Sequence, residues 1–566
     1  MPSAIASLAR SLIVAASFAA AGAAGGSSLS GAYLAAMQAD FRNDYVEASA
    51  YYDRALIGAP DNVDLMVDAV VARVAMGDAA EAVPLAEKLA TADAGNQIAT
   101  LVLVAAAIAA EDFERASTLL GTAGPETVNP LLGGLLAGWI EVGREDFAAA
   151  SARFDALTGN DALAAYGQYH KALALALAGD FVSAAEIIGG GEEGPLHLNR
   201  AAIIAHAQIL AQIGREDEAV AVLDAALAGG VPDAPIIALR DRLGAGEEVG
   251  FDQVTRARDG AAEAFLTLAD ALVGEEASRV ALIHARLAAF IRPDLAEADL
   301  LSADILEAQE QFDLASAALA AVPEASPWYV SAQVRLADTQ RAAGDPEAGI
   351  ATLTALAAGN PERIEVDSAL GDALRMAERF PEAAAAYTKA IDRIETPRQA
   401  HWVLYYTRGI ARERAGDWPA AEADFRKALE IEPGQPMVLN YLGYSLVEKQ
   451  ESLDEALAMI EQAVRSEPDD GYITDSLGWV LYRLGRYGDA VPPMLRAVEL
   501  TPDDPVINDH LGDVLWKVGR KREAEFQWRR ALSFGPADDL DMERIRRKLE
   551  VGLDAVVAEE PDQQDG

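Results

Sequence analysis

The chain has 566 residues, with 46 Lys and Arg against 90 Asp and Glu, and its formal net charge is −44. This acidic excess argues against broad binding to nucleic acid or to anionic lipid, because both need clustered cationic side chains. Cysteine is absent, which excludes disulfides, thiolate metal sites, cysteine nucleophiles and a lipid anchor on an N-terminal cysteine.

Residues 1–28 are predicted to be a signal peptide. Arg10 precedes the apolar stretch Ser11–Phe18, and small residues follow from Ala19 to Ser28. This order, with a small-x-small site ending at Ala23, is typical of a cleaved secretory leader, so we expect a periplasmic protein. The alternative is an ordinary capping helix of a cytoplasmic protein. No later stretch has the ~20 unbroken apolar residues of a membrane span, so no transmembrane segment is expected.

Residues 29–230 carry small and aromatic residues at intervals near 34, which indicates about six degenerate helix–turn–helix units. The residues that mark these units are Ala48, Tyr52, Pro60, Gly77, Ala82, Ala116, Ala150, Phe154, Gly179, Ala184, Gly214 and Ala219. The apolar run from Ile98 to Ala110 is too short to span a membrane. We expect it to be a buried repeat helix.

Residues 231–261 contain the strongest break in the pattern. Pro232 and Pro235 come close together, and Gly244, Gly246 and Gly250 follow. Clustered Gly and Pro are typical of loops, so this segment is predicted to be a linker or hinge between two arrays. The alternative is an ordinary repeat with a long loop, because Ile236–Leu243 can still form a short helix.

Residues 262–536 keep the clearest register and are predicted to hold eight units, with short insertions near Thr396 and Ser452. Four closing prolines, spaced 35, 34 and 34 residues apart, are Pro433, Pro468, Pro502 and Pro536. Small residues at the eighth position are Gly409, Gly443, Gly478 and Gly512, and large residues at the twenty-fourth are Phe425, Ile460, Met494 and Trp528. We expect each small residue to let the two helices of a unit approach closely and each large residue to fill the gap between them.

Residues 537–553 are predicted to be an amphipathic capping helix, because Met542, Ile545 and Leu549 share one stripe. The acidic residues 554–566 are predicted to be a disordered tail. Since repeat units contact mainly their neighbours and this helix can cap one end, residues 262–550 are expected to fold alone. The new apolar face at Ala262 is the weak point of such a fragment.

The 34-residue period, with its Leu-Gly, mid-repeat Ala, large residue, Ala and Pro, resembles the tetratricopeptide repeat. The resemblance implies an all-α fold, a right-handed superhelix or α-solenoid of about 14 helix–turn–helix units whose N-terminal members are degenerate. Such solenoids usually bind other molecules on a long curved surface and do not transform them.

The resemblance also implies a partner-binding groove, which in this family is lined by positions 2, 5, 9, 12 and 13 of the first helix of each unit. In this chain the implied groove residues are Tyr406, Arg414, Asn440, Tyr444, Asp475, Trp479, Tyr482, Arg483, Asp509, Asp513, Trp516 and Lys517. Aromatic rings interleaved with amide, acidic and basic groups suit an extended peptide. The alternative is that rings such as Trp479 and Trp516 pack between neighbouring units.

No catalytic, cofactor-binding or metal-binding residues are predicted. The sequence has no H-E-x-x-H, G-x-S-x-G or phosphate-binding P-loop motif. Gly189–Gly194 matches the dinucleotide pattern formally, but a helix precedes it and Pro195 follows, so we interpret it as a loop. A late basic cluster, at Lys517–Arg530 and Arg544–Lys548, indicates helix-end charges on solvated faces or else a docking patch for an acidic partner.

Three strings carry a more specific resemblance. They are Leu439–Leu446, Asp475–Gly485 and His510–Trp516, and they look like long repeat proteins of the bacterial envelope, a group that includes the lipoprotein adaptor of a carboxyl-terminal processing protease. The resemblance implies a non-catalytic scaffold or adaptor for protein or peptide partners, including an envelope protease and its substrates. The adaptor's anchoring cysteine is missing here. The alternatives are a cytoplasmic co-chaperone-like protein and the substrate arm of an enzyme complex.

Overall fold

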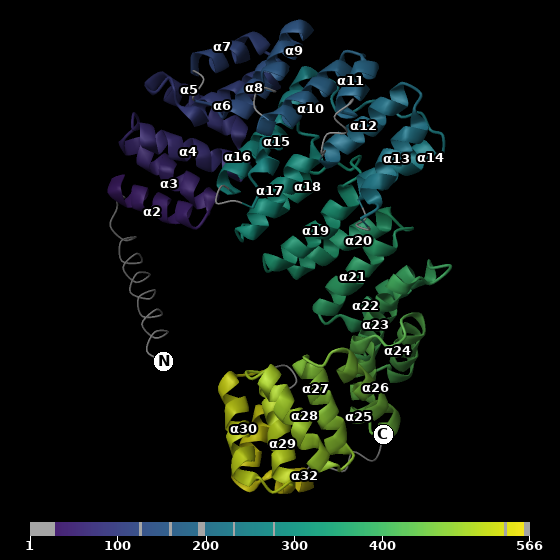
Figure 1. The fold of residues 1–566 in the computed structure, drawn as a ribbon. Coiled ribbons are helices and arrows are strands. Elements are labelled where there is room, and N and C mark those ends of the chain that lie inside the picture. The colour runs from purple at the N-terminus through teal and green to yellow at the C-terminus, as the bar shows by residue number, and fades with distance from the viewer. Residues whose placement is uncertain are drawn as a thin grey trace. The chain divides into compact units, whose positions relative to one another are not determined.

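The computed structural model describes residues 29–123, 127–157, 161–190, 199–229, 233–274, 278–536 and 540–559. Every regular element that these residues form is a helix, so the predicted all-α fold is confirmed (Figure 1). The predicted signal peptide, residues 1–28, lies outside the described residues, as do the end of the acidic tail after residue 559 and residues 191–194 of the glycine-rich loop.

The chain divides into two compact units, residues 1–352 and 353–566. The first unit contains α2 (Leu29–Phe41), α3 (Tyr45–Gly58), α4 (Val63–Met76), α5 (Ala79–Ala92), α6 (Gln97–Ala109), α7 (Phe113–Ala123), α8 (Pro130–Gly143), α9 (Phe147–Ala156), α10 (Asp161–Leu177), α11 (Phe181–Ile188), α12 (Arg200–Gln212), α13 (Glu216–Leu227), α14 (Ala234–Gly244), α15 (Ala257–Ala271), α16 (Ser278–Ile291), α17 (Ala296–Ala308), α18 (Phe312–Ala321) and α19 (Tyr329–Ala342). The next helix, α20 (Pro346–Gly359), crosses the boundary between the units.

The second unit continues the alternation of helices. It contains α21 (Ile364–Met376), α22 (Phe380–Asp392), the short 3-10 helix η3 (Gln399–His401), α23 (Trp402–Arg414), α24 (Trp418–Ile431), α25 (Pro436–Glu448), α26 (Leu453–Ser466), α27 (Gly471–Arg483), α28 (Tyr487–Leu500), α29 (Pro505–Lys517), α30 (Lys521–Phe534), α31 (Met542–Val551) and α32 (Leu553–Glu559).

The helices of the described residues form successive antiparallel pairs. Six pairs run from α2–α3 to α12–α13, and eight run from α15–α16 to α29–α30, with α14 between the two series. These are the six degenerate and eight regular units that the sequence predicts. The apolar run that begins at Ile98 forms the buried helix α6, as expected.

The turn between the two helices of a pair has the same dipeptide, Gly followed by Asp, in four units. Gly77, Gly179, Gly344 and Gly416 have φ angles of +103°, +86°, +92° and +87°. Glycine adopts this left-handed conformation without the clash that a Cβ would cause, and it ends the first helix of the unit. The Asp that follows then begins the second helix: the Asp180 side chain, for example, accepts a hydrogen bond from the amide of Ser183.

The predicted fit of a small residue against a large one inside each unit is confirmed. A Cβ on Gly409 would lie 2.6 Å from Phe425, one on Gly443 2.8 Å from Ile460, and one on Gly478 2.5 Å from Met494. The glycine therefore lets the large ring or chain of the second helix lie directly on the backbone of the first. Phe425, Ile460 and Met494 are fully buried as a result.

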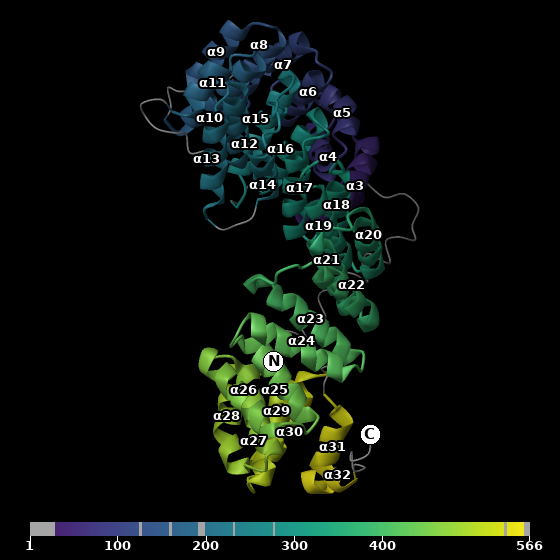
Figure 2. The same cartoon turned by 90° about the vertical axis from the view of Figure 1, so that its right-hand side faces the viewer.

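Helices α15 and α16 make contacts far outside their own neighbourhood in the chain. α15 packs on α8, and α16 packs on α4, α5 and α6, so this pair lies against the N-terminal repeats (Figures 1 and 2). The predicted linker, residues 231–261, therefore lies within the first unit, and it contains α14 and the first turns of α15. The short helix Ile236–Leu243, which was the alternative interpretation, is present, and the boundary between the compact units falls after Thr352.

The end of the chain forms two helices where one was expected. α31 corresponds to the predicted capping helix, and Gly552 (φ +85°) separates it from α32. The predicted disordered tail is wrong up to Glu559, because Leu553 and Val556 are buried and hold α32 on the body of the unit. α31 contacts α30 (Figure 2).

Candidate functional site

The twelve predicted groove residues lie on the first helices of four successive units. We call this surface the first-helix face of the second unit. Tyr406 and Arg414 are on α23, Asn440 and Tyr444 on α25, Asp475, Trp479, Tyr482 and Arg483 on α27, and Asp509, Asp513, Trp516 and Lys517 on α29. The structure separates them into four groups with different surroundings.

The first group is an aromatic stack centred on Trp479. Its ring lies parallel to those of Tyr482 and His510, with centroids 4.8 and 4.0 Å away. The indole Nε1 donates to Glu448 Oε1 at 2.6 Å, and Arg483 also reaches this carboxylate. His510 is buried, and the rings of Trp479 and Tyr482 are half-buried.

Two oxygen atoms at equivalent positions of α25 and α27 lack hydrogen-bond donors among the described residues. They are Asn440 Oδ1 and Asp475 Oδ1. The other oxygen of Asp475 lies 2.8 Å from His510 Nδ1. Burial lowers the pKa of His510, but the carboxylates of Asp475, Asp509 and Asp513 outweigh it, and the pKa is raised. Both oxygens are buried, so the lack of a donor makes them costly to the fold.

At α23 the surface is more closed. Tyr406 packs on Trp402, Phe425 and Tyr441, with centroids 5.8 to 6.1 Å away. Arg414 is exposed and lies over the ring of Phe380. Tyr444, on α25, is half-buried. In the sequence it lies between the rings around Tyr406 and those around Trp479. The surroundings of Tyr406 therefore fit the alternative in which the ring packs between neighbouring units, and not an exposed ring that binds a partner.

The residues on α29 contact the chain's own C-terminal helices. Lys548 of α31 is 1% exposed, and its Nζ donates to Asp509 at 2.8 Å and to Asp513 at 2.7 Å. Asp554 of α32 accepts hydrogen bonds from Trp516 and Lys517 at 2.9 and 2.6 Å. For these four residues on α29, a role in binding another molecule stays a prediction.

Sequence reasoning missed the residues that organise this surface. Glu448 and His510 were not selected, although His510 follows Asp475 by one repeat and one residue. In the sequence Lys548 belongs to a basic cluster. Most residues of that cluster form ion pairs with acidic residues of the same chain, as Arg520 does with Glu523 and Arg547 with Glu559. No periodic signal marks Lys548 or Asp554, because both lie after the last repeat.

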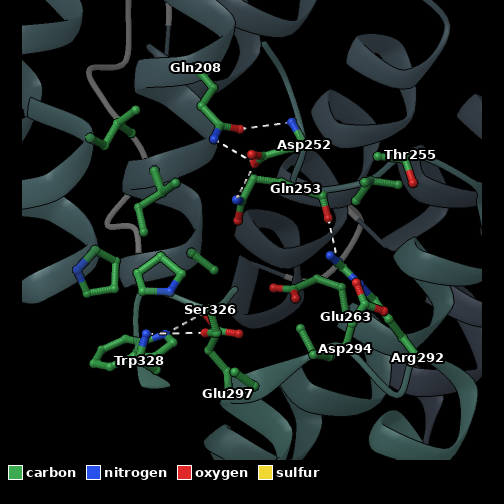
Figure 3. Close-up of a pocket in the computed structure, with 18 of the residues that line it drawn as sticks. Gln208, Asp252, Gln253, Thr255, Glu263, Arg292, Asp294, Glu297, Ser326 and Trp328 are labelled. Atoms are coloured by element: carbon green, nitrogen blue, oxygen red, sulfur yellow. Dashed lines mark hydrogen bonds and ion pairs between the residues drawn. The ribbon is translucent and has the colours of Figure 1, made fainter. Parts of the chain in front are cut away.

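A second candidate site, not predicted from the sequence, is a cavity of about 560 Å³ in the first unit. We call it the first-unit cavity. Figure 3 shows its polar lining, which comes from several helices and loops and includes Gln208, Asp252, Glu263, Arg292, Glu297 and Trp328. A volume in this range is typical of ligand pockets. A smaller cavity of about 360 Å³ adjoins it, and Glu263 and Glu297 line both.

Glu263 is the most buried carboxylate of this lining, at 8% exposure. Tyr169 donates its hydroxyl to Glu263 at 3.2 Å, and Trp328 donates its indole N–H to Glu297 at 3.0 Å. Burial, reinforced by the charge of Glu297, raises the pKa of Glu263 to about 7.

Neither surface has the features of a metal centre or of a membrane segment. The part of the chain that the structure describes has no group of three or more His, Asp and Glu placed to hold a metal ion. Within the same ranges, no helix is long and apolar enough to cross a membrane.

The paired helices and their spacing define a helical-repeat solenoid. Sequence models of the tetratricopeptide repeat match residues 73–138, 135–188, 334–399, 402–435 and 442–505. The repeats of this chain are therefore tetratricopeptide repeats, as the sequence resemblance implies.

Several known proteins are similar to parts of this chain. The TPR repeat-containing protein PA4667 of Pseudomonas aeruginosa is 40% identical over 87 residues, which are 15% of this chain and 15% of that protein. A tetratricopeptide repeat protein from Parabacteroides merdae is 18% identical with a TM-score of 0.37, and covers 45% of this chain and 97% of its own. The APC/C hetero-tetramer Cut9–Hcn1 is 14% identical over 92% of this chain and 95% of its own, also with a TM-score of 0.37.

Proposed function

We propose that the chain is a non-catalytic scaffold or adaptor that binds an extended segment of a partner protein on the first-helix face of the second unit. The carrying observation is the stack of the half-buried rings of Trp479 and Tyr482 on α27, beside the charged pair of Glu448 and Arg483. Aromatic rings beside charged side chains suit an extended peptide, whose side chains pack on the rings.

The binding surface in this proposal is centred on α25 and α27. Trp479 and Tyr482 supply apolar area, and Arg483 with Glu448 supplies charge at the edge. The C-terminal helices pair with the polar residues of α29, so α31 and α32 form one end of the surface.

The experiment is a screen of the purified chain against an array of extended peptides from envelope proteins, with Trp479→Ala and Tyr482→Ala as site variants. Loss of an aromatic anchor commonly costs about 2 kcal/mol or more, or roughly thirtyfold in affinity. The matched control is Phe526→Ala, which removes an exposed ring from α30. Normal peptide binding by folded Trp479→Ala and Tyr482→Ala would place the partner surface elsewhere.

We also propose that the protein acts in the bacterial cell envelope and presents substrates to a protease or an assembly machine. The support is the order of charged, apolar and small residues before Ser28 and the resemblance of Asp475–Gly485 to envelope repeat proteins. Edman sequencing of mature protein from a periplasmic extract should begin near Ala24. Recovery of intact Met1 from the cytoplasmic fraction would contradict the envelope location.

A further inference from the structure

The first-unit cavity is a different site from the proposed partner surface, because all of its lining belongs to the first compact unit. We propose that it binds a cationic group, a primary ammonium or a guanidinium, between Glu263 and Glu297. The source of that group is a lysine or arginine side chain of a peptide or a free polyamine.

The first argument is the lack of a cation at a deeply buried carboxylate. Among the described residues, no Lys or Arg forms an ion pair with Glu263, whose donor is the neutral hydroxyl of Tyr169. A buried carboxylate in the second unit does have cationic partners: Asp424 forms ion pairs with Arg408 and Arg412 at 2.7 and 2.8 Å. Burying a charge is costly unless it is paired, so the arrangement at Glu263 favours an incoming cation.

The second argument is the charge balance of the cavity. Its two guanidinium groups are matched by other carboxylates: Arg292 lies 3.6 Å from Asp294, and Arg242 lies 3.2 Å from Glu247. Arg292 also donates to the backbone oxygen of Gln253 at 2.7 Å (Figure 3). Glu263 and Glu297 therefore have no ion pair of their own among the described residues, although the charge of Arg292 partly offsets the rise in the pKa of Glu263.

The third argument is the chemistry of the walls. Tyr169 and Trp328 each donate to one carboxylate of the pair, which fixes the oxygens, and their rings add apolar surface. The guanidinium of Arg200 lies 4.6 Å from the centroid of the Trp328 ring, so one cation already packs on this indole beside the smaller cavity. An ammonium with an alkyl chain fits this combination of fixed acceptors and aromatic walls.

The test is isothermal titration calorimetry on the purified full chain. The probes are spermidine, a capped alanine pentapeptide with one central lysine, and the same peptide with norleucine in place of lysine. We expect spermidine or the lysine peptide to bind and the norleucine peptide not to bind. Glu263→Gln and Glu297→Gln should each weaken binding by at least about tenfold, because each removes one charge of the pair and keeps its shape.

The matched control is Glu216→Gln, which removes the same charge from an exposed position of α13 in the same unit. It should change the affinity by less than about twofold, because exposed charges are screened by salt. Circular dichroism of each variant checks the fold. Since two independent isosteric variants are used, failure of one of them to fold leaves the other to decide.

Proton linkage gives a second readout. Glu263 must be ionised to attract the cation, so binding should tighten as pH rises from 6 to 8 and should release a proton, and Glu263→Gln should abolish both effects. The charged and titratable groups around Glu263 are Tyr169 on α10, Arg200 on α12, Arg242 on α14, Asp252 in the following loop, Asp270 on α15, Arg292 after α16, and Asp294, Glu297 and Asp304 at α17.

The outcomes separate the sources. Binding of the lysine peptide without spermidine identifies a side chain of a peptide, and the reverse identifies a free polyamine. Absence of binding by both at about 1 mM, equal binding of the norleucine peptide, or equal loss in Glu216→Gln and Glu263→Gln would overturn the proposal.

Discussion

Gly260 of α15 lies directly against the indole ring of Trp139 on α8, across 121 residues of sequence. A Cβ on Gly260 would overlap the indole carbons, so this pair needs the absence of a side chain. Trp139 is fully buried, and its Nε1 donates to His170 of α10 at 2.9 Å. Three helices from separate repeats therefore meet at one ring.

We expect Gly260→Ala to destabilise the first unit by about 1–3 kcal/mol, because even one methyl group overpacks the contact with Trp139. The measurement is the urea midpoint of the full chain, followed by circular dichroism. Gly250→Ala is the control, since a Cβ there meets open space. Equal midpoints for the two variants would show that α15 is not held tightly on α8.

His170 predicts an acid sensitivity of the first unit. It accepts the indole hydrogen of Trp139 and is buried, and burial lowers its pKa to about 3. The unfolded chain, with a pKa near 6.5, takes up the proton first. Stability from neutral His170 is therefore complete above pH 6.5 and is lost as pH falls towards 3, by about 2 kcal/mol between pH 7 and pH 5.

Buried carboxyls act in the opposite direction, because the pKa values of Glu263 and Asp299 are raised to about 7 and about 6. A comparison with His170→Gln isolates the histidine. Its urea midpoint should be lower than that of the wild type at pH 7, and the difference should shrink at pH 5. A constant difference across this range would contradict the neutral, buried state of His170.

Lys548 should be essential for the second unit. Lys548→Met leaves the carboxylates of Asp509 and Asp513 buried without their cation, which typically costs about 3–5 kcal/mol. Thermal denaturation of the full chain should show a lower transition for this unit. Lys427→Met, which removes an exposed pair with Glu430, should leave the transition unchanged. An unchanged transition in Lys548→Met would show that α31 contributes little.

Fragments of the chain should distinguish the boundary after Thr352 from the boundary near residue 262 that the sequence predicts. Residues 353–566 should give a helical spectrum and a cooperative melt, because they form one compact unit. A fragment that begins at residue 262 cuts α15 and strips α16 of α4, α5 and α6, which exposes Leu282 and Leu287. We expect that fragment to aggregate. A monomeric, cooperatively melting 262–550 would instead favour the boundary that the sequence predicts.

The sequence by itself determined the repeat unit. Position eight and position twenty-four of one unit are 16 residues apart, so the pairing of Gly478 with Met494 is encoded in the period and could be predicted. The first-helix register also placed Trp479, Tyr482 and Asp475 on one surface. Such contacts are local, and each repeat encodes its own copy of them.

The tertiary structure alone decided which of these surfaces remain open. Gly260 fits Trp139 only because the first unit brings α15 onto α8, and Lys548 reaches Asp509 only because α31 folds back after the last repeat. The cavity at Glu263 follows from the same long-range packing, since its walls come from residues between Tyr169 and Trp328. The repeat period encodes contacts between neighbouring repeats. Contacts between distant helices depend instead on how the helices of one unit pack together, and the spacing of residues in the sequence does not indicate this packing.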